Sequence, residues 1–358
     1  MRVTFVLPHA GLAGGIRVCA IYAKALQARG HVVNVVSTPK PPPTSFRKKV
    51  KHLLAGGYKD REPGHLDNAG VPHKVIDAWR PIVDADLPDA DVVIATWWET
   101  AEWVAKLSPT KGKKVYFIQH DERFVGQPTQ RVEATFKLPM YRVTIAQWLI
   151  DLARHTYGVD QIDLVLNGVD TGHFTAPPRN KQKTPTVGMM YATAPFKGCD
   201  IALEAFKNAS RNIGTLKLVA FGQHHPREEL PLPPGAVFTY RPEQPKIPEI
   251  YAQCDAWLFA SRSEGFGLPI LEAMACRTPV LGTPTGAAPE LISQGGGVLV
   301  KPQDPIDLGK AIERICRLPA EEWKLLSDAA YETAQANTWQ RCTEQFEASL
   351  LRAAARPA

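Results

Sequence analysis

The chain has 358 residues, of which 44% are hydrophobic and 22% are charged, and its formal net charge is +6. This composition excludes disordered, collagen-like and coiled-coil proteins, and the length favours two domains because single hydrophobic cores rarely exceed about 250–300 residues. No run of about 18 apolar residues and no convincing signal peptide are present, so we expect a cytoplasmic protein without a membrane span. The six cysteines contain no CxxC pair, which argues against a disulfide framework and a zinc site.

The first part of the chain has the pattern of a βαβ unit. An apolar run at residues 2–8 precedes the glycine-rich HAGLAGGIR, a helical pattern that ends at Gly30, and a second apolar run at residues 31–38. Buried strands are also predicted at residues 91–98 and 113–120. This order predicts a doubly wound domain, in which ligands bind beyond the carboxyl ends of the strands.

A basic amphipathic segment occupies residues 46–54, where Arg47, Lys48, Lys49 and Lys51 are interleaved with apolar residues. One interpretation is contact with an anionic membrane surface, at about 1 kcal/mol for each basic side chain near it. The alternative is an ordinary solvated helix face. The mild positive balance does not require a nucleic acid partner, and we expect none.

The second half repeats the alternation of strands and helices after a proline-rich, charged stretch at residues 176–186, which is the best linker candidate. Strands are predicted at residues 184–192, 216–222, 236–240, 255–261, 278–283 and 296–300, and helices at 200–210, 271–277, 289–294 and 306–318. We therefore expect a first domain at 1–170, a second doubly wound domain at 171–337, and a C-terminal helix at 338–358 that packs back on the first domain. Two such domains predict a ligand cleft between them.

The stretch SRSEGFGLPILEAMACR places Glu264 in a loop and Glu272 inside a helix predicted from Pro269 to Cys276. The free N–H groups of the first helical turn form an anion site that suits a diphosphate without a metal ion. The two carboxylates could then bind hydroxyls at opposite ends of a nucleotide sugar. The plainer interpretation is that Glu272 stabilises the helix dipole, by about 0.3–1 kcal/mol, while Glu264 caps the turn.

These residues resemble the E-x7-E signature of retaining glycosyltransferases of the GT-B fold, family 4. The resemblance extends from about Val3 to about Pro305 and is more specific in the second half. It includes Gly14-Gly15, the segment NGVD with Phe174, Lys197-Gly198, Pro279-Val280, APEL and GGVLVKPQDP. The family implies two Rossmann-like domains that face each other across a cleft, with a C-terminal helix that crosses back to the first.

The resemblance also implies roles in donor binding and catalysis. Glu264 would contact the donor sugar and Glu272 the ribose. Lys197 would neutralise the diphosphate leaving group, although an exposed lysine before a helix is the plainer interpretation. Backbone amides of Phe266, Gly267 and Leu268 would hold sugar and phosphate. The glycine loop of Gly14 and Gly15 would complete the donor-binding set.

In the first domain, the family places a histidine near the reacting carbon, after a central strand. His120 in VYFIQHDER is the candidate, although Gln119 would take that position in another register. The adjacent Asp121 and Glu122 could bind the acceptor hydroxyl or could be simple solvated charges.

Two positions depart from the family pattern. Six residues before Lys197, where members commonly carry an arginine, the chain has Tyr191. Arg277 occupies a position where the family usually has glycine. Neutralisation of the phosphates would then depend on Lys197, on the helix terminus, or on an arginine from elsewhere, for which Arg277 is one candidate.

We therefore predict transfer of a sugar from a nucleotide diphospho-sugar to a glycan or lipid-linked acceptor, with retained anomeric configuration and no metal or cofactor. The setting would be bacterial cell-surface polysaccharide or glycolipid synthesis, in the cytoplasm or at the inner face of the membrane through residues 46–54. The alternatives are a sugar-nucleotide epimerase of the same fold and a sugar-binding protein without turnover.

Overall fold

The structure is a computed structural model that describes residues 1–41 and 64–356. The basic segment at residues 46–54 lies outside the described residues, so its two interpretations stay predictions. The chain divides into two compact units. Unit 1 is Met1–Ile145, Leu149–Val165 and Thr343–Ala358, and unit 2 is Ala146–Trp148 and Leu166–Cys342.

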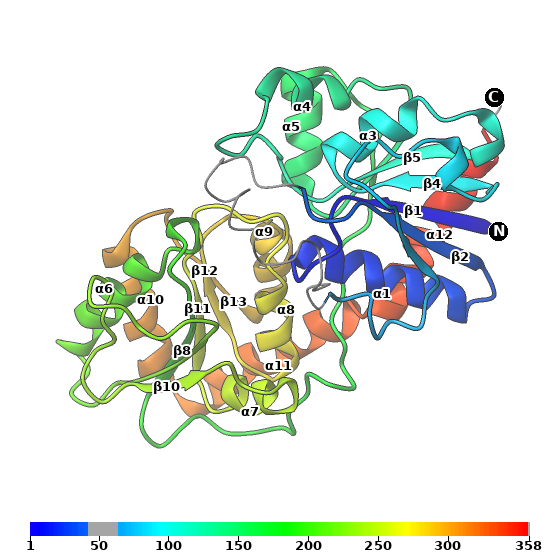
Figure 1. Ribbon diagram of the computed structural model, residues 1–358. Helices are drawn as coiled ribbons and strands as arrows, with labels where there is room; N and C mark the ends of the chain where they lie inside the picture. Colours follow the sequence, from blue (N-terminus) through cyan, green and yellow to red (C-terminus); the bar gives the residue numbers. More distant parts are fainter. Residues whose placement is uncertain (42–63, 357–358) are drawn as a thin grey trace. The chain divides into compact units, whose positions relative to one another are not determined.

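Unit 1 is built on a parallel sheet with the strand order β3-β2-β1-β4-β5-β6-β7. Figure 1 labels β2, β1, β4 and β5 of this series. The strands are β1 (Arg2–Leu7), β2 (Val32–Ser37), β3 (His73–Val75), β4 (Val92–Ala95), β5 (Lys113–Ile118), β6 (Tyr141–Thr144) and β7 (Asp163–Leu164). The chain winds outward from β1 in one direction and then, from β4, in the other. The neighbouring strands β1 and β4 therefore form a topological switch point, beyond whose carboxyl ends ligands bind in open α/β sheets.

The helices of unit 1 include the end of the chain. They are α1 (Gly14–Ala28), α3 (Trp98–Ala105), α4 (Thr129–Thr135), α5 (Gln147–Tyr157) and α12 (Trp339–Ala354). Phe346 of α12 stacks on Tyr22 of α1 with a centroid distance of 4.4 Å, and it lies 5.0 Å from the ring of Phe117 in β5. Glu347 pairs with Arg29 at 2.6 Å. The prediction that the C-terminal helix packs back on the first domain is confirmed.

Unit 2 is a second doubly wound sheet, with the strand order β10-β9-β8-β11-β12-β13. Its strands are β8 (Thr186–Tyr191), β9 (Lys217–Gly222), β10 (Val237–Tyr240), β11 (Ala256–Phe259), β12 (Val280–Gly282) and β13 (Gly297–Leu299). Its helices are α6 (Cys199–Ser210), α7 (Ile247–Ala252), α8 (Leu268–Ala275), α9 (Ala288–Leu291), α10 (Pro305–Arg317) and α11 (Ala320–Ala336). The predicted architecture of two doubly wound domains is confirmed, and the switch point of unit 2 lies between β8 and β11.

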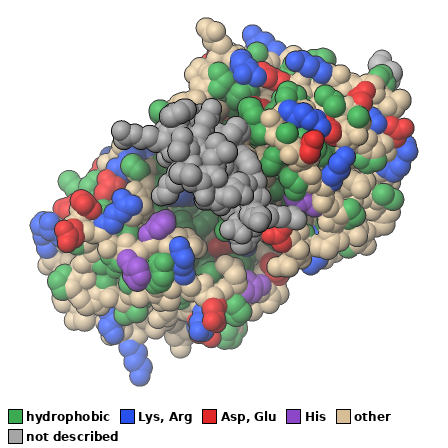
Figure 2. Space-filling view, in the orientation of Figure 1, with side chains coloured by type: hydrophobic (Ala, Val, Ile, Leu, Met, Phe, Trp, Pro, Cys, Tyr) green, Lys and Arg blue, Asp and Glu red, His purple; other side chains and the backbone are tan. Residues whose placement is uncertain are grey.

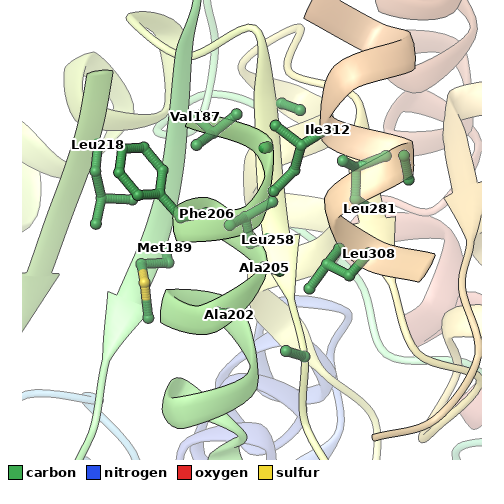
Figure 3. Packing of buried hydrophobic residues seen from close by; sticks show 14 of the residues in the cluster. Val187, Met189, Ala202, Ala205, Phe206, Leu218, Leu258, Leu281, Leu308 and Ile312 are labelled. Atoms are coloured by element: carbon green, nitrogen blue, oxygen red, sulfur yellow. The ribbon is translucent and has the colours of Figure 1, made fainter. Parts of the chain in front are cut away.

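Both faces of the unit 2 sheet are buried, which explains why its strands are continuous apolar runs in the sequence. On one face, Val187 and Met189 of β8 pack with Phe206 of α6 and with Leu308 and Ile312 of α10 (Figure 3). The intervening side chains point to the other face, because successive residues of a strand alternate. There Trp257 of β11 meets Tyr251 of α7, with ring centroids 4.4 Å apart.

Charged side chains of both signs are interspersed on the visible face of each unit (Figure 2). No helix among residues 1–41 and 64–356 is both long enough and apolar enough to span a membrane.

Candidate functional site

The loops that follow β8 and β11 meet at the switch point of unit 2. The first carries the short helical turn η3 (Pro195–Lys197), and the second runs from Ala260 to Gly267. A backbone hydrogen bond of 2.7 Å from the N–H of Arg262 to the carbonyl of Phe196 joins them. The two segments are far apart in sequence, so the strand order brings them together.

Lys197 and Glu264 form an ion pair across these loops. Lys197 Nζ lies 2.6 Å from Glu264 Oε1, and the same oxygen accepts a hydrogen bond of 2.8 Å from Ser261 Oγ. The side chains are 24% and 12% exposed, so water screens this pair less than a surface pair. The two residues to which the family resemblance assigned separate contacts with the donor are thus bonded to each other.

Gly198 permits this close approach. Its backbone has a φ of +62°, and a Cβ placed there would lie 1.8 Å from the carbonyl oxygen of Ala260. The left-handed conformation and the lack of space both require glycine. The Lys-Gly pair of the sequence therefore has a physical reason: the glycine lets the loop that carries Lys197 lie against the loop that carries Glu264.

The N-terminus of α8 follows directly. The helix begins at Leu268, one residue before the predicted start, and Gly267 is its N-cap with a φ of +96°. A Cβ on Gly267 would lie 2.7 Å from the ring of Phe259, so this turn also depends on glycine. The side chain of Phe266 is buried, which leaves its backbone as the part that could touch a ligand. The first N–H groups of a helix lack intrahelical partners and favour an anion.

Glu272 lies one turn into α8 and is half-buried. Its Oε2 accepts a hydrogen bond of 3.0 Å from the hydroxyl of Tyr251, whose side chain is fully buried in α7. Tyr251 was not predicted as part of the site, because no local motif links α7 to α8. Its hydroxyl fixes the direction of the carboxylate, so Glu272 is held in place before any ligand binds.

The two departures from the family pattern have structural explanations. Tyr191 is buried at the end of β8, and its hydroxyl donates to the carbonyl of Leu230 at 2.8 Å. Arg277 follows α8 with a φ of +57°, the left-handed region in which glycine is the usual residue. Its guanidinium pairs with Asp328, donates to the carbonyl of Ala176 at 3.2 Å, and lies 4.0 Å from the ring centroid of Tyr331. It is thus held at the C-terminal end of α8, and the structure does not favour Arg277 as the source of the missing charge.

Arg262 lies close to Lys197, and the sequence did not single it out. It donates to the carbonyl of Pro195 at 2.6 Å and forms a two-pronged pair with Asp200. The guanidinium lowers the pKa of Asp200 through these hydrogen bonds. The pair fastens η3 to the start of α6, which supports the position of Lys197.

In unit 1, Gly14 and Gly15 are the first residues of α1, whereas the sequence suggested a loop before the helix. A Cβ on Gly15 would lie 3.3 Å from Nε2 of Gln119, so the residue after β5 packs against the first turn of α1. The carbonyl oxygen of the Gln119 side chain is buried and has no hydrogen-bond partner among the described residues.

His120 is half-buried, and its Nδ1 lies 2.9 Å from the carbonyl oxygen of Asp121. That contact assigns the proton to Nδ1 in the neutral ring and makes Nε2 the basic nitrogen. The structure therefore places His120, Gly14 and Gly15 in unit 1, and Lys197, Glu264 and Glu272 in unit 2.

The two acids after His120 have different environments. Glu122 is 2% exposed, accepts a hydrogen bond of 2.6 Å from the backbone N–H of Trp98, and so caps α3. Burial raises the pKa of this carboxyl well above its ordinary value. The interpretation of Glu122 as a solvated charge is therefore wrong. Asp121 pairs with Arg123 at 2.8 Å.

No group of three or more His, Cys, Asp or Glu side chains suited to a metal ion occurs within residues 1–41 and 64–356. All six cysteines are buried as free thiols.

Residues 173–333 match the family model described as "Glycosyl transferases group 1". The chain is 26% identical over 395 residues to the D-inositol 3-phosphate glycosyltransferase of Mycolicibacterium smegmatis, with coverage of 97% of this chain and 88% of the relative. It is 33% identical over 108 residues to the O-antigen chain mannosyltransferase B of Escherichia coli, which covers 30% of this chain and 27% of the relative.

Solved structures share the fold. The Anabaena protein Alr3699/HepE in complex with UDP matches with a TM-score of 0.74 and 17% identity over 98% of this chain and 100% of that chain. WaaG, described as a glycosyltransferase involved in lipopolysaccharide biosynthesis, matches with a TM-score of 0.67 and 15% identity over 98% and 99% of the two chains. At these identities the likeness concerns the fold.

Proposed function

We propose that the chain is a retaining glycosyltransferase of the glycosyl transferases group 1 family, whose model matches residues 173–333, and that unit 2 holds the nucleotide-sugar donor while unit 1 binds the acceptor. The observation that carries the proposal is the Lys197–Glu264 pair at the switch point of unit 2. It adjoins the N-terminus of α8, and Glu272 follows one turn later. This set offers a cation and free amides for a diphosphate, with a carboxylate on each side for hydroxyl groups.

The reaction breaks the bond between the anomeric carbon of the sugar and the diphosphate. A bond from the acceptor oxygen to the same face of that carbon forms, and the proton of the acceptor hydroxyl passes to the leaving phosphate. The transition state resembles an oxocarbenium ion, and negative charge grows on the diphosphate. Lys197 and the amides at the start of α8 would stabilise that charge. Glu264 would position the sugar and would not act as a nucleophile.

Donor binding would change the partner of Lys197. In the free protein its ammonium faces Glu264, whereas the diphosphate would offer a stronger anion. The carboxylate of Glu264, still held by Ser261 at 2.8 Å, would then turn its acceptor capacity toward the hydroxyls of the sugar. The ion pair therefore keeps both groups in place until the donor arrives.

His120 in unit 1 would lie near the reacting carbon and accept a hydrogen bond from the sugar or the acceptor through its basic Nε2. The tautomer set by the carbonyl of Asp121 supports this role. Gln119, which packs on Gly15, stays the alternative if the histidine position of the family falls one residue earlier in this chain.

We further propose that the product belongs to a bacterial cell-surface polysaccharide or glycolipid. The names of the relatives in O-antigen and inositol phosphate glycosylation support this assignment. A peripheral contact of residues 46–54 with anionic lipid would place the enzyme beside such acceptors. Binding of the protein at low salt to vesicles that contain phosphatidylglycerol tests that contact. Protein that stays unbound in the presence of such vesicles would refute it.

Thermal shift against UDP, GDP, dTDP and ADP tests donor binding, because a ligand at 100 times its dissociation constant adds about 2.7 kcal/mol of stability. We expect one of these four nucleotides to stabilise the chain. Glu272→Ala should weaken the binding of that nucleotide, whereas Glu264→Ala should mainly slow turnover. Release of the nucleoside diphosphate from the matching donor sugar, followed without an acceptor, measures bond cleavage. An isomerised sugar in that incubation would identify an epimerase instead, and wild-type activity of both variants would refute the assigned roles.

A further inference from the structure

The loop that carries Glu264 is held by a tryptophan from a distant part of the sequence. The indole Nε1 of Trp148 donates a hydrogen bond of 3.0 Å to the carbonyl oxygen of Gly265. Trp148 is the second residue of α5, and it belongs to unit 2 although the helix from Leu149 onward belongs to unit 1. The contact therefore lies within unit 2, at the loop to which the proposed function assigns the donor.

The carbonyl of the next residue, Phe266, is held as well. It accepts a hydrogen bond of 2.8 Å from the N–H of Ala287. Gly286 makes this contact possible, because its φ is +62° and a Cβ there would lie 2.4 Å from the carbonyl oxygen of Phe266. Trp148 and Ala287 thus fix the carbonyl groups on both sides of the Phe266 N–H.

The motif APEL connects these two contacts. It forms α9, whose N-cap is Ala287. Within this helix, Oε1 of Glu290 accepts a hydrogen bond of 2.7 Å from the N–H of Gln147, the residue before Trp148. One short helix therefore anchors Phe266 through its N-cap and Trp148 through its neighbour. This gives APEL, which the family resemblance included without a role, a physical function in holding the loop.

The Phe266 N–H is the donor whose direction these contacts set. A planar trans peptide places its C=O and its N–H on opposite sides. The hydrogen bond at the Gly265 carbonyl therefore makes the Phe266 N–H of the same peptide point away from the indole. No acceptor for this N–H occurs among residues 1–41 and 64–356, although Phe266 is only 4% exposed and buried N–H groups are nearly always paired. A hydrogen bond at the carbonyl also polarises the peptide and strengthens its N–H as a donor.

We propose that Trp148 is a positioning residue of the donor site, which directs the Phe266 N–H at an oxygen of the bound sugar nucleotide. In this role the indole touches no reacting atom and acts only through the Gly265–Phe266 peptide. A donor fixed in advance costs no reorganisation when negative charge develops during the reaction. The inference rests on the proposed function, because it takes this loop as the donor site. It adds a residue that no motif in the sequence marks and that lies 117 residues from the carbonyl it binds.

One NMR signal reports on this peptide, because Gly265-Phe266 is the only Gly-Phe pair in the sequence. Glycine labelled with ¹³C at the carbonyl and phenylalanine labelled with ¹⁵N give a single carbonyl–amide correlation on the full chain. Benzothienylalanine in place of Trp148 keeps the shape of the indole and has sulfur instead of its N–H. We expect this exchange to shift the Gly265 carbonyl resonance of the free protein. An unchanged resonance would show that the hydrogen bond does not form, and would overturn the proposal.

Ligand binding tests where the N–H points. UDP-glucose, GDP-mannose, dTDP-glucose and ADP-glucose are added in turn, and the one that stabilises the chain should move the Phe266 proton resonance downfield in wild type. In the benzothienylalanine protein we expect a smaller shift. Turnover, measured as release of the nucleoside diphosphate without an acceptor, should fall about tenfold in kcat with less change in KM, because orientation counts most in the transition state. Trp148→Phe, which also lacks the indole N–H, should lose kcat to a similar extent.

Trp323 provides the matched control. Its indole also donates to a backbone carbonyl, that of Asp255 at 2.9 Å, and its side chain is fully buried in unit 2. Asp255 precedes β11, whereas the donor loop follows this strand. Benzothienylalanine in place of Trp323 should therefore lower stability but leave the Gly265–Phe266 signal and kcat as they are in wild type.

The outcomes separate the role of Trp148 from the proposed function. If none of the four sugar nucleotides binds wild type, the proposed function fails and the role of Trp148 fails with it. If one binds, but the Phe266 signal and kcat are alike in wild type and in the protein with benzothienylalanine in place of Trp148, only the role of Trp148 is refuted. Equal losses of kcat from the exchanges of Trp148 and Trp323 would also refute it, since such losses would come from general destabilisation.

Discussion

Replacement of Gly198 by alanine tests whether the close approach of two loops holds the donor site together. The added Cβ would lie 1.8 Å from the carbonyl oxygen of Ala260 and 2.7 Å from its carbonyl carbon, both backbone atoms that cannot rotate away. The loops after β8 and β11 must therefore move apart. A left-handed conformation costs a residue with a side chain about 1–2 kcal/mol, and overpacking of this kind costs about 1–3 kcal/mol.

The expected total for Gly198→Ala is about 2–5 kcal/mol of unfolding free energy, the sum of those two costs. The displacement also lengthens the contact between Lys197 Nζ and Glu264 Oε1, which is 2.6 Å in the native arrangement. Since a misplacement of about 1 Å can reduce turnover on the order of 100-fold, we expect a loss of that size together with weaker nucleotide binding.

Gly235→Ala is the matched control. Gly235 lies in the same unit, has a φ of +79°, and has no atom within 4 Å of the position of a Cβ. It should therefore show the conformational cost alone, about 1–2 kcal/mol, with unchanged nucleotide affinity. Urea denaturation followed by tryptophan fluorescence and titration calorimetry with the matching nucleotide provide the two measurements. Equal stability and equal affinity of the two variants would refute the reasoning about Gly198.

Three further changes test the packing, the buried acid and the donor carboxylate. Phe346→Ala should lower the unfolding free energy by about 3–5 kcal/mol in urea denaturation, because this fully buried ring joins α12 to unit 1; a loss below about 1 kcal/mol would show that α12 contributes little. Burial raises the pKa of the Glu122 carboxyl in the folded state. The unfolding free energy of wild type should therefore fall as pH rises above the unfolded pKa of about 4.3 toward the raised value, whereas that of Glu122→Gln should not. Parallel pH profiles of the unfolding free energy in the two proteins would contradict this. Tyr251→Phe removes the hydroxyl that directs Glu272 and should weaken nucleotide binding about fivefold, since a single hydrogen bond contributes about 0.5–1.5 kcal/mol. If Glu272 acts on the ribose, 2′-deoxynucleotides should bind equally well to wild type and to Tyr251→Phe.

The strands were predictable because burial on both faces produces continuous apolar runs. Val92–Ala95 and Lys113–Ile118 lie within the predicted segments, and every pair in both sheets is parallel, as βαβ connections require. The order of the strands was not predictable from these runs, because periodicity records which residues are buried and does not record which strand is the neighbour. The switch points therefore became visible only in the structure.

Helix α11, Ala320–Ala336, was not among the predicted helices. Its buried positions include Ser327, Thr333 and Ala334 beside a single large side chain, Trp323. Small and hydroxyl-bearing residues give a weak apolar stripe, so the helical period is hard to recognise even where the helix packs closely against α8.

The candidate site was predictable in its local parts. Lys197, Glu264 and Glu272 belong to short motifs on loops and on the first turns of helices, where spacing along the chain is informative. Their pairing was not predictable, since Lys197 and Glu264 are 67 residues apart and meet through the strand order. The environment of Glu122 was not predictable for the same reason. HDER has the composition of a solvated turn, whereas the backbone N–H that binds the buried carboxyl belongs to Trp98, 24 residues earlier in the chain.

Arg277 shows that a departure from a family pattern can concern the backbone and not the chemistry. A glycine is expected at this position because the chain leaves α8 in the left-handed region, and this protein adopts the same conformation, with a φ of +57°, despite a long side chain. The pair with Asp328 and the contact with Tyr331 then offset the conformational cost and hold the guanidinium at the end of the helix. Since Tyr191 is buried and uncharged, the proposed neutralisation of the diphosphate depends on Lys197 and the amides that begin α8, which is why the spacing set by Gly198 matters so much to the proposed reaction.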